Sequence, residues 1–247
     1  MALPKLDCII YDLTLPLSKK EIRFRPFLVK EEKILLMAME SNENDTVILA
    51  VKQILNNCCI DEIDINSLPV ADMEFLFLNL RARSVGEVVE LPYKCNHKIT
   101  NDKDEEKECG NIVTLEVNVL EINPEIDPSH TNSIELADKM GIIMKYPSFK
   151  MVEDSEKSKD VTEVEKVMNI LIACIDSIYT EEEIFYAKDV SKNELVDFVE
   201  SLTRDQFLKI QGFFDTIPKI KKDIHFECGK CGYQEDITIE GLQSFFV

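Results

Sequence analysis

The spacing of apolar residues changes several times along the chain. Over residues 7–28, apolar and polar residues alternate on two short arms, which predicts a β-hairpin that turns at Ser18–Lys20. Apolar residues then recur every three or four positions, and this spacing predicts helices over 29–41, 45–58 and 70–84. The first part of the chain is therefore expected to combine a small sheet with helices.

Strict alternation returns in two central segments. EVVELPYK (87–94) and NIVTLEVNVLEI (111–122) each read as a strand. Between them, NDKDEEKE (101–108) has nothing to bury, so we expect an exposed, mobile loop. A second polar run, EDSEKSKD (153–160), has the same character, and we place a domain boundary there.

Three capping-box patterns mark helix starts in the C-terminal part. In this motif the side chain of the first residue accepts a hydrogen bond from the backbone N–H three residues later. The side chain of that later residue accepts the backbone N–H of the first. The pairs are Thr162 with Glu165, Ser191 with Glu194, and Thr203 with Gln206. The first of these helices is expected to bury Val164, Val167, Met168, Leu171, Cys174, Ile175 and Ile178. Pro218 should end the third, since proline cannot continue a helix.

After Pro218 the alternation of KKDIHFEC and DITIEG predicts a terminal hairpin whose tip is CGKC. The predicted fold class is α+β: an N-terminal β-hairpin plus helices, a central β region, and a C-terminal helical part ending in a zinc-ribbon-like β-hairpin. Two domains are expected. Residues 1–152 form an α+β region with the first cysteine pair, and residues 161–247 form a helical region ending in the CxxC hairpin, packed on the first through a shared metal site.

Charge narrows the classes of partner. The 247 residues carry 28 Lys and Arg against 47 Asp and Glu, a net charge of −19. Such a chain repels nucleic acid and anionic membrane surfaces, so a protein partner with a basic or apolar face is expected. No signal peptide or membrane-spanning run is evident, which indicates a cytosolic protein. In that compartment, eight cysteines are better explained as core residues or metal ligands than as disulfides.

Four of the cysteines have the setting of metal ligands. Cys228 and Cys231 form a Cys-x-x-Cys turn followed by Gly232, a geometry that points two thiolates at one ion. Cys95 and Cys109 bracket the acidic segment and supply two more sulfurs. We predict a structural zinc site of Cys95, Cys109, Cys228 and Cys231, with His97 as a reserve ligand. Glycines at 110, 229 and 232 adjoin these cysteines, as expected if the turns need positive φ.

Other interpretations of these cysteines stay open. The four thiols could be incidental surface residues, or Cys228 and Cys231 could form a redox pair, although the βαβ context of such pairs is not evident. A shell closed by four protein ligands would leave no position for water or substrate, so a bound metal would be structural. The remaining cysteines fall within strand or helix patterns and are expected in the core: Cys8, Cys58, Cys59 and Cys174.

The sequence contains no recognisable catalytic motif. There is no Ser/His/Asp spacing, glycine-rich phosphate loop or HExxH pattern, and we expect no enzymatic activity. Four of the five arginines lie in two short patches, RFRPF (23–27) and LRARS (80–84). Arg23, Arg25, Arg81 and Arg83 either pair with carboxylates of the same chain or form a docking surface, since arginine is enriched at protein interfaces.

Several long strings, in the same order, resemble the baseplate hub protein family of T-even-like contractile-tailed bacteriophages. They are RPFLVKEEKILLMAME (25–40), FLNLRARSVGEVVELPYKC (77–95), MKYPS (144–148), AKDVSKNELVDF (187–198), FFDTIPKIKK (213–222) and CGKCGY (228–233). The resemblance implies a non-enzymatic late protein that assembles the tail baseplate hub. Its expected locations are the host cytoplasm during assembly and the virion tail, and its expected partners are other hub or tape-measure proteins. The alternatives are a tape-measure-binding assembly chaperone absent from the virion and, less in keeping with the charge, a zinc-ribbon nucleic-acid-binding protein.

Overall fold

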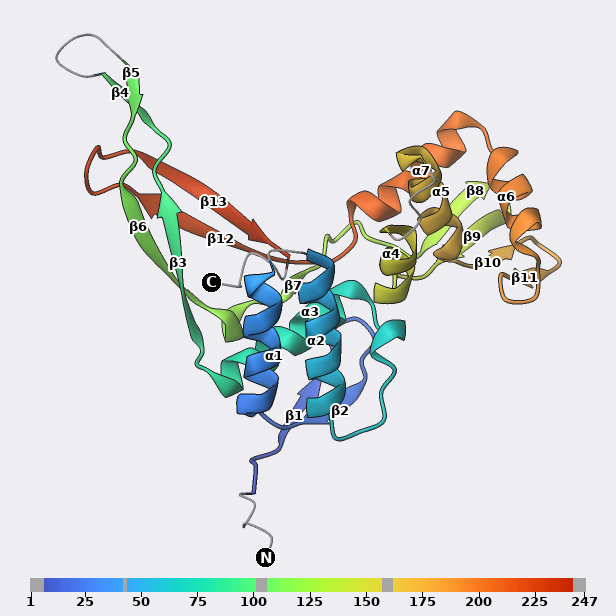
Figure 1. Ribbon diagram of the computed structural model, residues 1–247. Coiled ribbons are helices and arrows are strands. Elements are labelled where there is room, and N and C mark those ends of the chain that lie inside the picture. The colour runs from blue at the N-terminus through green and yellow to red at the C-terminus, as the bar shows by residue number, and fades with distance from the viewer. Residues whose placement is uncertain (1–6, 42–43, 101–105, 157–161, 242–247) are drawn as a thin grey trace, which may run out of the picture. The chain divides into compact units, whose positions relative to one another are not determined.

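The computed structural model describes residues 7–41, 44–100, 106–156 and 162–241 (Figure 1). Over these residues the protein combines helices with several small antiparallel sheets, which confirms the predicted α+β class. The chain divides into two compact units. Unit 1 comprises Met1–Ile63, Glu74–Glu125 and Lys219–Val247, and unit 2 comprises Asp64–Met73 and Ile126–Pro218.

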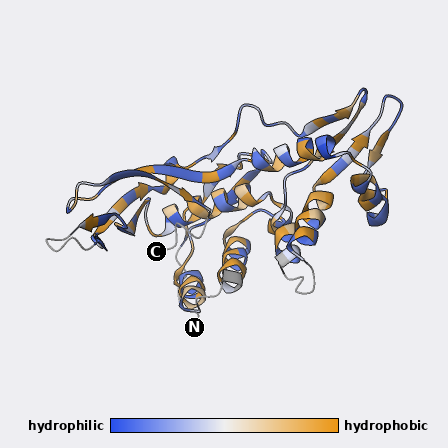
Figure 2. Ribbon diagram, turned by 90° about the horizontal axis from the view of Figure 1, so that it is seen from above, coloured by the Kyte–Doolittle hydropathy of each residue, from blue (hydrophilic) through white to orange (hydrophobic). Residues whose placement is uncertain are grey.

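The first part of unit 1 follows the predicted order of elements. Strands β1 (Tyr11–Thr14) and β2 (Glu21–Phe24) pair as an antiparallel hairpin, and helices α1 (Val29–Glu40) and α2 (Asn44–Cys58) pack against each other. Helix α3 (Val70–Ser84) belongs to unit 1 from Glu74 onward. The side chains of Leu15, Ile22, Ile54, Leu55 and Phe77 are almost completely buried. Figure 2 shows hydrophobic and hydrophilic residues interleaved along these helices, as the sequence periodicity predicts.

Two long hairpins complete unit 1. Strands β3 (Val88–Lys94) and β6 (Ile112–Asn118) pair in register from Val88 opposite Asn118 to Lys94 opposite Ile112. The same hairpin continues as the short pair β4 (Lys98–Thr100) and β5 (Glu106–Glu108). The terminal hairpin joins β12 (Lys219–Glu227) to β13 (Gln234–Glu240), and β12 also pairs with β7 (Pro124–Glu125). A 3₁₀ turn, η2 (Val119–Glu121), lies between β6 and β7.

Unit 2 is built around a four-stranded antiparallel sheet in the order β11-β10-β9-β8. Its strands are β8 (Ser133–Ala137), β9 (Met140–Met144), β10 (Ile175–Tyr179) and β11 (Ile184–Tyr186). Its helices are η1 (Ile65–Ser67), α4 (Phe149–Glu156), α5 (Glu163–Ala173), α6 (Lys192–Glu200) and α7 (Arg204–Asp215). Ile142, Cys174, Ile175 and Ile210 lie at the centre of one hydrophobic core that joins sheet and helices.

The three predicted capping boxes are confirmed. Each hydroxyl accepts a hydrogen bond from the backbone N–H three residues later, and the side chain there accepts from the capping residue's N–H. In α5, for example, the Thr162 N–H donates to Glu165 Oε2 at 2.8 Å. Helix α7 ends at Asp215, shortly before Pro218, as expected.

The predicted length of the first C-terminal helix is wrong. Helix α5 ends at Ala173, and the next residues form β10, which pairs with β9 on one side and β11 on the other. Burial in this helix also differs from the prediction, because the side chains of Val164 and Val167 are 73% and 61% exposed. The apolar spacing of this segment fits a helix, but β-branched Ile175 and Ile178 pack equally well on a sheet.

The two acidic runs are more ordered than predicted. Residues 106–108 form β5, and residues 153–156 belong to α4, whereas 101–105 and 157–160 lie outside the described residues. The domain division placed at 153–160 also differs from the one observed. Residues 126–152 belong to the same unit as the helices that follow, because β8 pairs with β9 and β9 pairs with β10, and the terminal hairpin belongs to unit 1.

Candidate metal centre

The first two cysteines lie opposite each other in the β3–β6 hairpin. Just beyond the last β3–β6 pair, the Cys95 N–H donates to the Asn111 carbonyl at 2.8 Å and the Gly110 N–H donates to the Cys95 carbonyl at 3.0 Å. The Cys109 N–H then donates to the His97 carbonyl at 2.8 Å, where the β4–β5 pair begins. Because 98–100 pair with 106–108, the two cysteines lie on facing arms of the hairpin and their thiols come close together despite their separation in the sequence.

The second pair lies at the tip of the β12–β13 hairpin. The Cys228 N–H donates to the Tyr233 carbonyl, and the Gly232 N–H donates to the Cys228 carbonyl, both at 2.8 Å. Gly232 has φ +70° and Gly110 has φ +65°, so both turns use the left-handed region that favours glycine. Gly229 is not among the glycines with positive φ, so that part of the expectation is wrong.

The two turns bring all four sulfurs into one cluster. The Sγ atoms of Cys95, Cys109, Cys228 and Cys231 all lie within 4.8 Å of one another. Cys95 Sγ is 3.7 Å from Cys231 Sγ, and Cys109 Sγ is 3.8 Å from Cys228 Sγ. A disulfide needs a sulfur separation of about 2.05 Å, and all four are free thiols. Three are buried and Cys231 is half-buried, so the cluster could hold a metal ion.

Neighbouring groups from both hairpins hold the cluster in place. Asn111 Nδ2 lies 3.6 Å from Cys228 Sγ, and Lys230 Nζ donates to the Cys109 carbonyl at 3.2 Å. Beside the sulfurs, the rings of Tyr93 and Phe226 meet edge to face with centroids 4.9 Å apart. Both polar contacts cross from one hairpin to the other, so they fix the relative position of the two cysteine pairs.

The environment separates the pKa values of the thiols. Burial acts to raise the pKa of Cys228, but the backbone N–H groups of Cys231 and Lys230, the Cys231 thiol and the Asn111 amide favour the thiolate and lower this pKa to about 6. Burial raises the pKa of Cys95 to about 12, and the pKa of Cys231 is also raised. The hydrogen-bond donors around Cys228 therefore favour its thiolate form.

His97, the reserve ligand, does not join this group of sulfurs. Its ring stacks on Tyr233, with centroids 4.5 Å apart and planes 10° from parallel. The sequence reasoning missed Asn111 and Lys230. Their positions beside Gly110 and inside the Cys-x-x-Cys turn were the available signal, because such residues have backbone and side-chain groups near the sulfurs.

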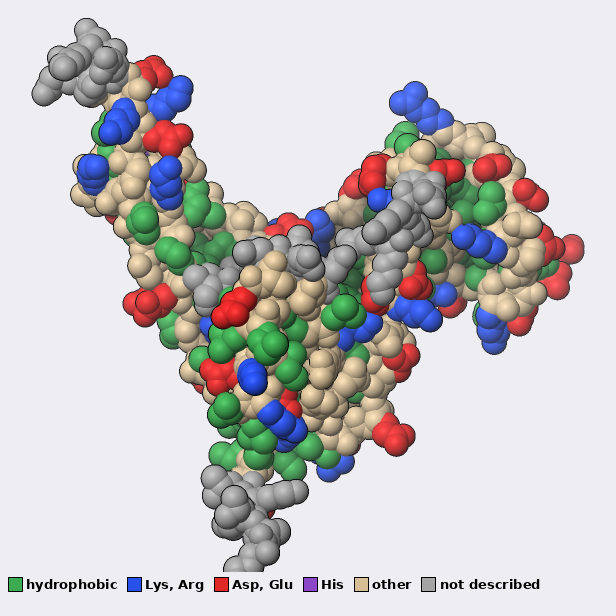
Figure 3. All heavy atoms as spheres, in the orientation of Figure 1, with side chains coloured by type: hydrophobic (Ala, Val, Ile, Leu, Met, Phe, Trp, Pro, Cys, Tyr) green, Lys and Arg blue, Asp and Glu red, His purple; other side chains and the backbone are tan. Residues whose placement is uncertain are grey.

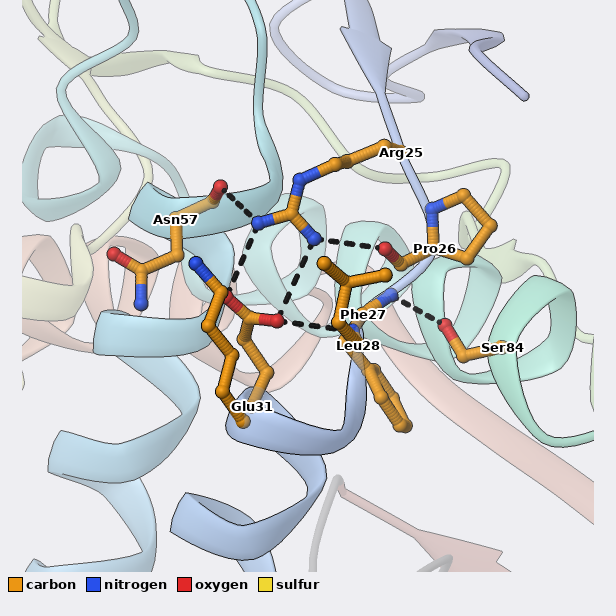
Figure 4. Close-up of polar contacts among 8 residues, drawn as sticks. Arg25, Pro26, Phe27, Leu28, Glu31, Asn57 and Ser84 are labelled. Carbon is orange, nitrogen blue, oxygen red and sulfur yellow. Dashed lines mark hydrogen bonds and ion pairs between the residues drawn. The ribbon is translucent and has the colours of Figure 1, made fainter. Parts of the chain in front are cut away.

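The Arg25 side chain donates hydrogen bonds to Glu31, Asn57 and Pro26 inside unit 1 (Figure 4). Its Nη2 donates to Glu31 Oε1 at 3.1 Å and to the Asn57 carbonyl at 2.9 Å, while Nη1 donates to the Pro26 carbonyl at 2.9 Å. The Glu31 side chain is fully buried, and it also accepts the Leu28 N–H at 2.9 Å, at the start of α1. Burial acts to raise the pKa of Glu31, but these donors hold it below its ordinary value.

The other three arginines have varied surroundings. Arg23 Nη2 lies 2.6 Å from Asp61 Oδ1, and Arg83 Nη1 lies 3.1 Å from Glu87 Oε1. The Arg83 guanidinium also lies 5.2 Å from the centroid of the Tyr11 ring. Burial lowers the pKa of Arg81. The ion pairs favour intramolecular pairing over a docking surface for Arg23, Arg25 and Arg83.

The remaining cysteines divide between core and surface. Cys58 and Cys174 are buried as expected and Cys59 is half-buried, but Cys8 is exposed, which corrects its assignment to the core. Cys8 lies before β1, outside the β1–β2 pairing that begins at Tyr11. His225 is exposed on β12, and its Nδ1 lies 2.9 Å from Asp236 Oδ1.

Comparison with known proteins assigns the chain to a family. No curated protein and no solved structure matches it. Among the described residues, no helix combines the length and the hydrophobicity needed to cross a membrane. A family model described as T4 bacteriophage base plate protein matches residues 9–247, almost the whole chain and both of its units. The chain therefore belongs to the T4 bacteriophage base plate protein family.

Proposed function

We propose that this protein is a structural or assembly component of the tail baseplate hub, and that it acts by binding other tail proteins. The observation that carries the proposal is the family match over residues 9–247. The finer assignment to the hub rests on the strings quoted above, among them RPFLVKEEKILLMAME and FLNLRARSVGEVVELPYKC. On this proposal the protein is made in the host cytoplasm and works at the phage tail.

The surface of the protein is consistent with protein partners. Helix α1 exposes Val29, Leu36 and Met37, with 80%, 54% and 61% of each residue accessible. Figure 3 shows hydrophobic side chains at the surface over this part of unit 1. The same view shows Lys and Arg interspersed with Asp and Glu, without a basic stripe. A nucleic-acid-binding role needs such a stripe to neutralise phosphates, so charge disfavours it.

We further propose that the four thiols hold a structural zinc ion. Zinc–sulfur bonds of about 2.3 Å in a tetrahedron separate the sulfurs by about 3.8 Å. The two pairs at 3.7 and 3.8 Å already have this spacing. Four thiolates complete the shell and leave no position for a substrate, so Cys95, Cys109, Cys228 and Cys231 would fasten two hairpins together.

Quantitative mass spectrometry of purified virions tests the hub assignment. A retained hub subunit should be present in an integral number of copies per tail. Absence from virions, combined with co-purification of a tail protein from infected cells, would instead support the assembly chaperone. If the protein neither enters virions nor co-purifies with any tail protein, the proposed function is wrong.

A further inference from the structure

The sheet of unit 2 ends in an unusual outer strand. Strand β11 (Ile184–Tyr186) occupies one edge of the order β11-β10-β9-β8 and, among the described residues, pairs only with β10. All three of its side chains are large and apolar or aromatic, and they are 50%, 41% and 47% exposed in chain order. Proteins normally protect such edges with lysine, proline, bulges or a covering element.

The backbone of β11 presents hydrogen-bonding groups outward. The Thr180 N–H donates to the Glu183 carbonyl at 2.9 Å, and the Ala187 N–H donates to the Asp176 carbonyl at 2.8 Å. In an antiparallel ladder, hydrogen-bonded pairs alternate with pairs that are not bonded. Between those two bonds, Phe185 opposite Ile178 is therefore the bonded pair.

Ile184 and Tyr186 consequently direct their backbone groups away from β10. The Tyr186 carbonyl accepts the Asp189 N–H at 2.9 Å. The Ile184 N–H, the Ile184 carbonyl and the Tyr186 N–H are then directed at the open edge of the sheet. These groups have the spacing of the donors and acceptors along one edge of a β-strand, so they can pair with the main chain of an added strand.

The charge of the residues next to β11 indicates which kind of partner strand would bind there. Glu181, Glu182 and Glu183 come directly before β11 and are exposed, and Glu181 pairs with Lys139. Figure 3 shows several acidic side chains at the surface of unit 2, among basic ones. A second copy of this chain would bring another net charge of −19 to the same edge, so self-pairing is disfavoured. A strand that carries Lys or Arg beside apolar residues complements both the carboxylates and the exposed apolar side chains.

We propose that β11 binds an extended segment of a partner protein, basic and apolar in alternation, which adds a fifth strand to the sheet of unit 2. The inference deepens the proposed function by specifying how a partner is bound, and it rests on that function for the existence of the partner. Main-chain hydrogen bonds to Ile184 and Tyr186 would supply affinity, and contacts with Glu182 and Glu183 would select a basic sequence.

The test uses the full chain and a short synthetic peptide of alternating Val and Lys. Amide exchange followed by NMR should slow at Ile184 and Tyr186 on binding, while Phe185, already bonded to β10, should change little. A peptide with the same lysines and proline in place of each valine keeps the charge but cannot form the ladder. We expect it to bind much more weakly.

Two variants and a control test whether the peptide binds at the β11 edge. Tyr186→Pro removes one outward N–H, and Ile184→Lys adds a like charge against the basic peptide; each should weaken binding about tenfold. Leu208→Lys also replaces an exposed apolar residue of unit 2 with lysine, but in α7, where Leu208 is 49% accessible. This variant should leave the affinity for the peptide unchanged. Circular dichroism of each variant verifies the fold, and Ile184→Lys provides the decisive result if Tyr186→Pro disturbs it.

Unchanged affinity in Ile184→Lys, or no slowing of exchange at Ile184 and Tyr186 at saturating peptide, would overturn the inference. Tail association separates this failure from that of the proposed function. If the wild-type protein joins tails and Ile184→Lys does so equally well, only the β11 inference is lost. If the wild-type protein binds the peptide at β11 but never associates with tail proteins, only the proposed function is lost.

Discussion

Cys109 Sγ lies 3.8 Å from Cys228 Sγ, although 119 residues separate the two cysteines in the sequence. Cys109 belongs to the hairpin of β3 and β6, and Cys228 lies at the end of β12. Between these segments the chain makes the whole of the sheet of unit 2. A metal shared by the two cysteine pairs would therefore link distant parts of the sequence within unit 1.

Replacing Cys228 should release the terminal hairpin. Cys228→Ser removes one of four thiolates, and since binding energy at a structural metal is also folding energy, bound zinc and melting temperature should both fall. Elemental analysis and thermal denaturation measure the two effects. Cys8→Ser alters an exposed cysteine outside the cluster and should change neither. A wild-type melting temperature that a strong chelator leaves unaltered would rule out the zinc proposal.

Glu31→Gln should destabilise unit 1 by about 3–5 kcal/mol, because it leaves the Arg25 guanidinium without its buried counter-charge. Urea denaturation measures this change. Asp61→Asn is the matched control. It neutralises the carboxylate that pairs with Arg23, where both partners are solvent-accessible, and should have little effect. Equal losses in the two variants would show that burial does not strengthen the Arg25–Glu31 pair.

The same carboxylate should contribute to acid sensitivity. The pKa of Glu31 is lowered on folding from its ordinary value of 4.5, so the folded state favours the charged form. Its contribution to stability should be complete above about pH 4.5 and should be lost as pH falls through the lower folded-state pKa. Unfolding free energies of the wild type and Glu31→Gln, measured across this range, should converge as pH falls. Parallel curves would contradict the assignment.

Gly141→Ala should destabilise unit 2 by about 1–3 kcal/mol. A methyl group at Gly141, near the start of β9, would collide with the Ile134 carbonyl on β8 and the Tyr179 hydroxyl on β10. Gly212→Ala offers a control with the opposite sign. No atom lies within 4 Å of the added carbon, and alanine in a helix is favoured over glycine by about 0.5–1 kcal/mol. Chemical denaturation compares both, and a neutral Gly141→Ala would show that β9 can shift.

Local signals in the sequence were sufficient to predict many of the helices and strands. The capping residues Thr162, Ser191 and Thr203 were identified because side chain and backbone interact within one turn of helix. The hairpin of β12 and β13 was predicted because alternation and turn chemistry agree over neighbouring residues. These elements depend on contacts between residues close in sequence, which periodicity reports directly.

The elements that were missed depend on distant pairing. Residues 175–179 have an apolar spacing compatible with a helix, but they form a strand between β11, which follows closely in the sequence, and β9, more than thirty residues earlier. The four cysteines could be proposed as a group from residue type and turn glycines. The pairing of β4 with β5, which brings Cys95 and Cys109 onto facing arms, could not be anticipated, because a charged segment gives no apolar signal for these strands.

Because unit 1 is built from separate segments of the chain, its parts become available for folding at different times during translation. Residues 126–218 leave the ribosome before β12 and β13, so the sheet of unit 2 can form while unit 1 still lacks its last hairpin. Domains generally fold as units during translation. Until Cys228 and Cys231 leave the ribosome, Cys95 and Cys109 have only two of the four sulfurs of the cluster. The four-sulfur cluster therefore forms late in translation or after it, and a translation product truncated before residue 228 cannot form it.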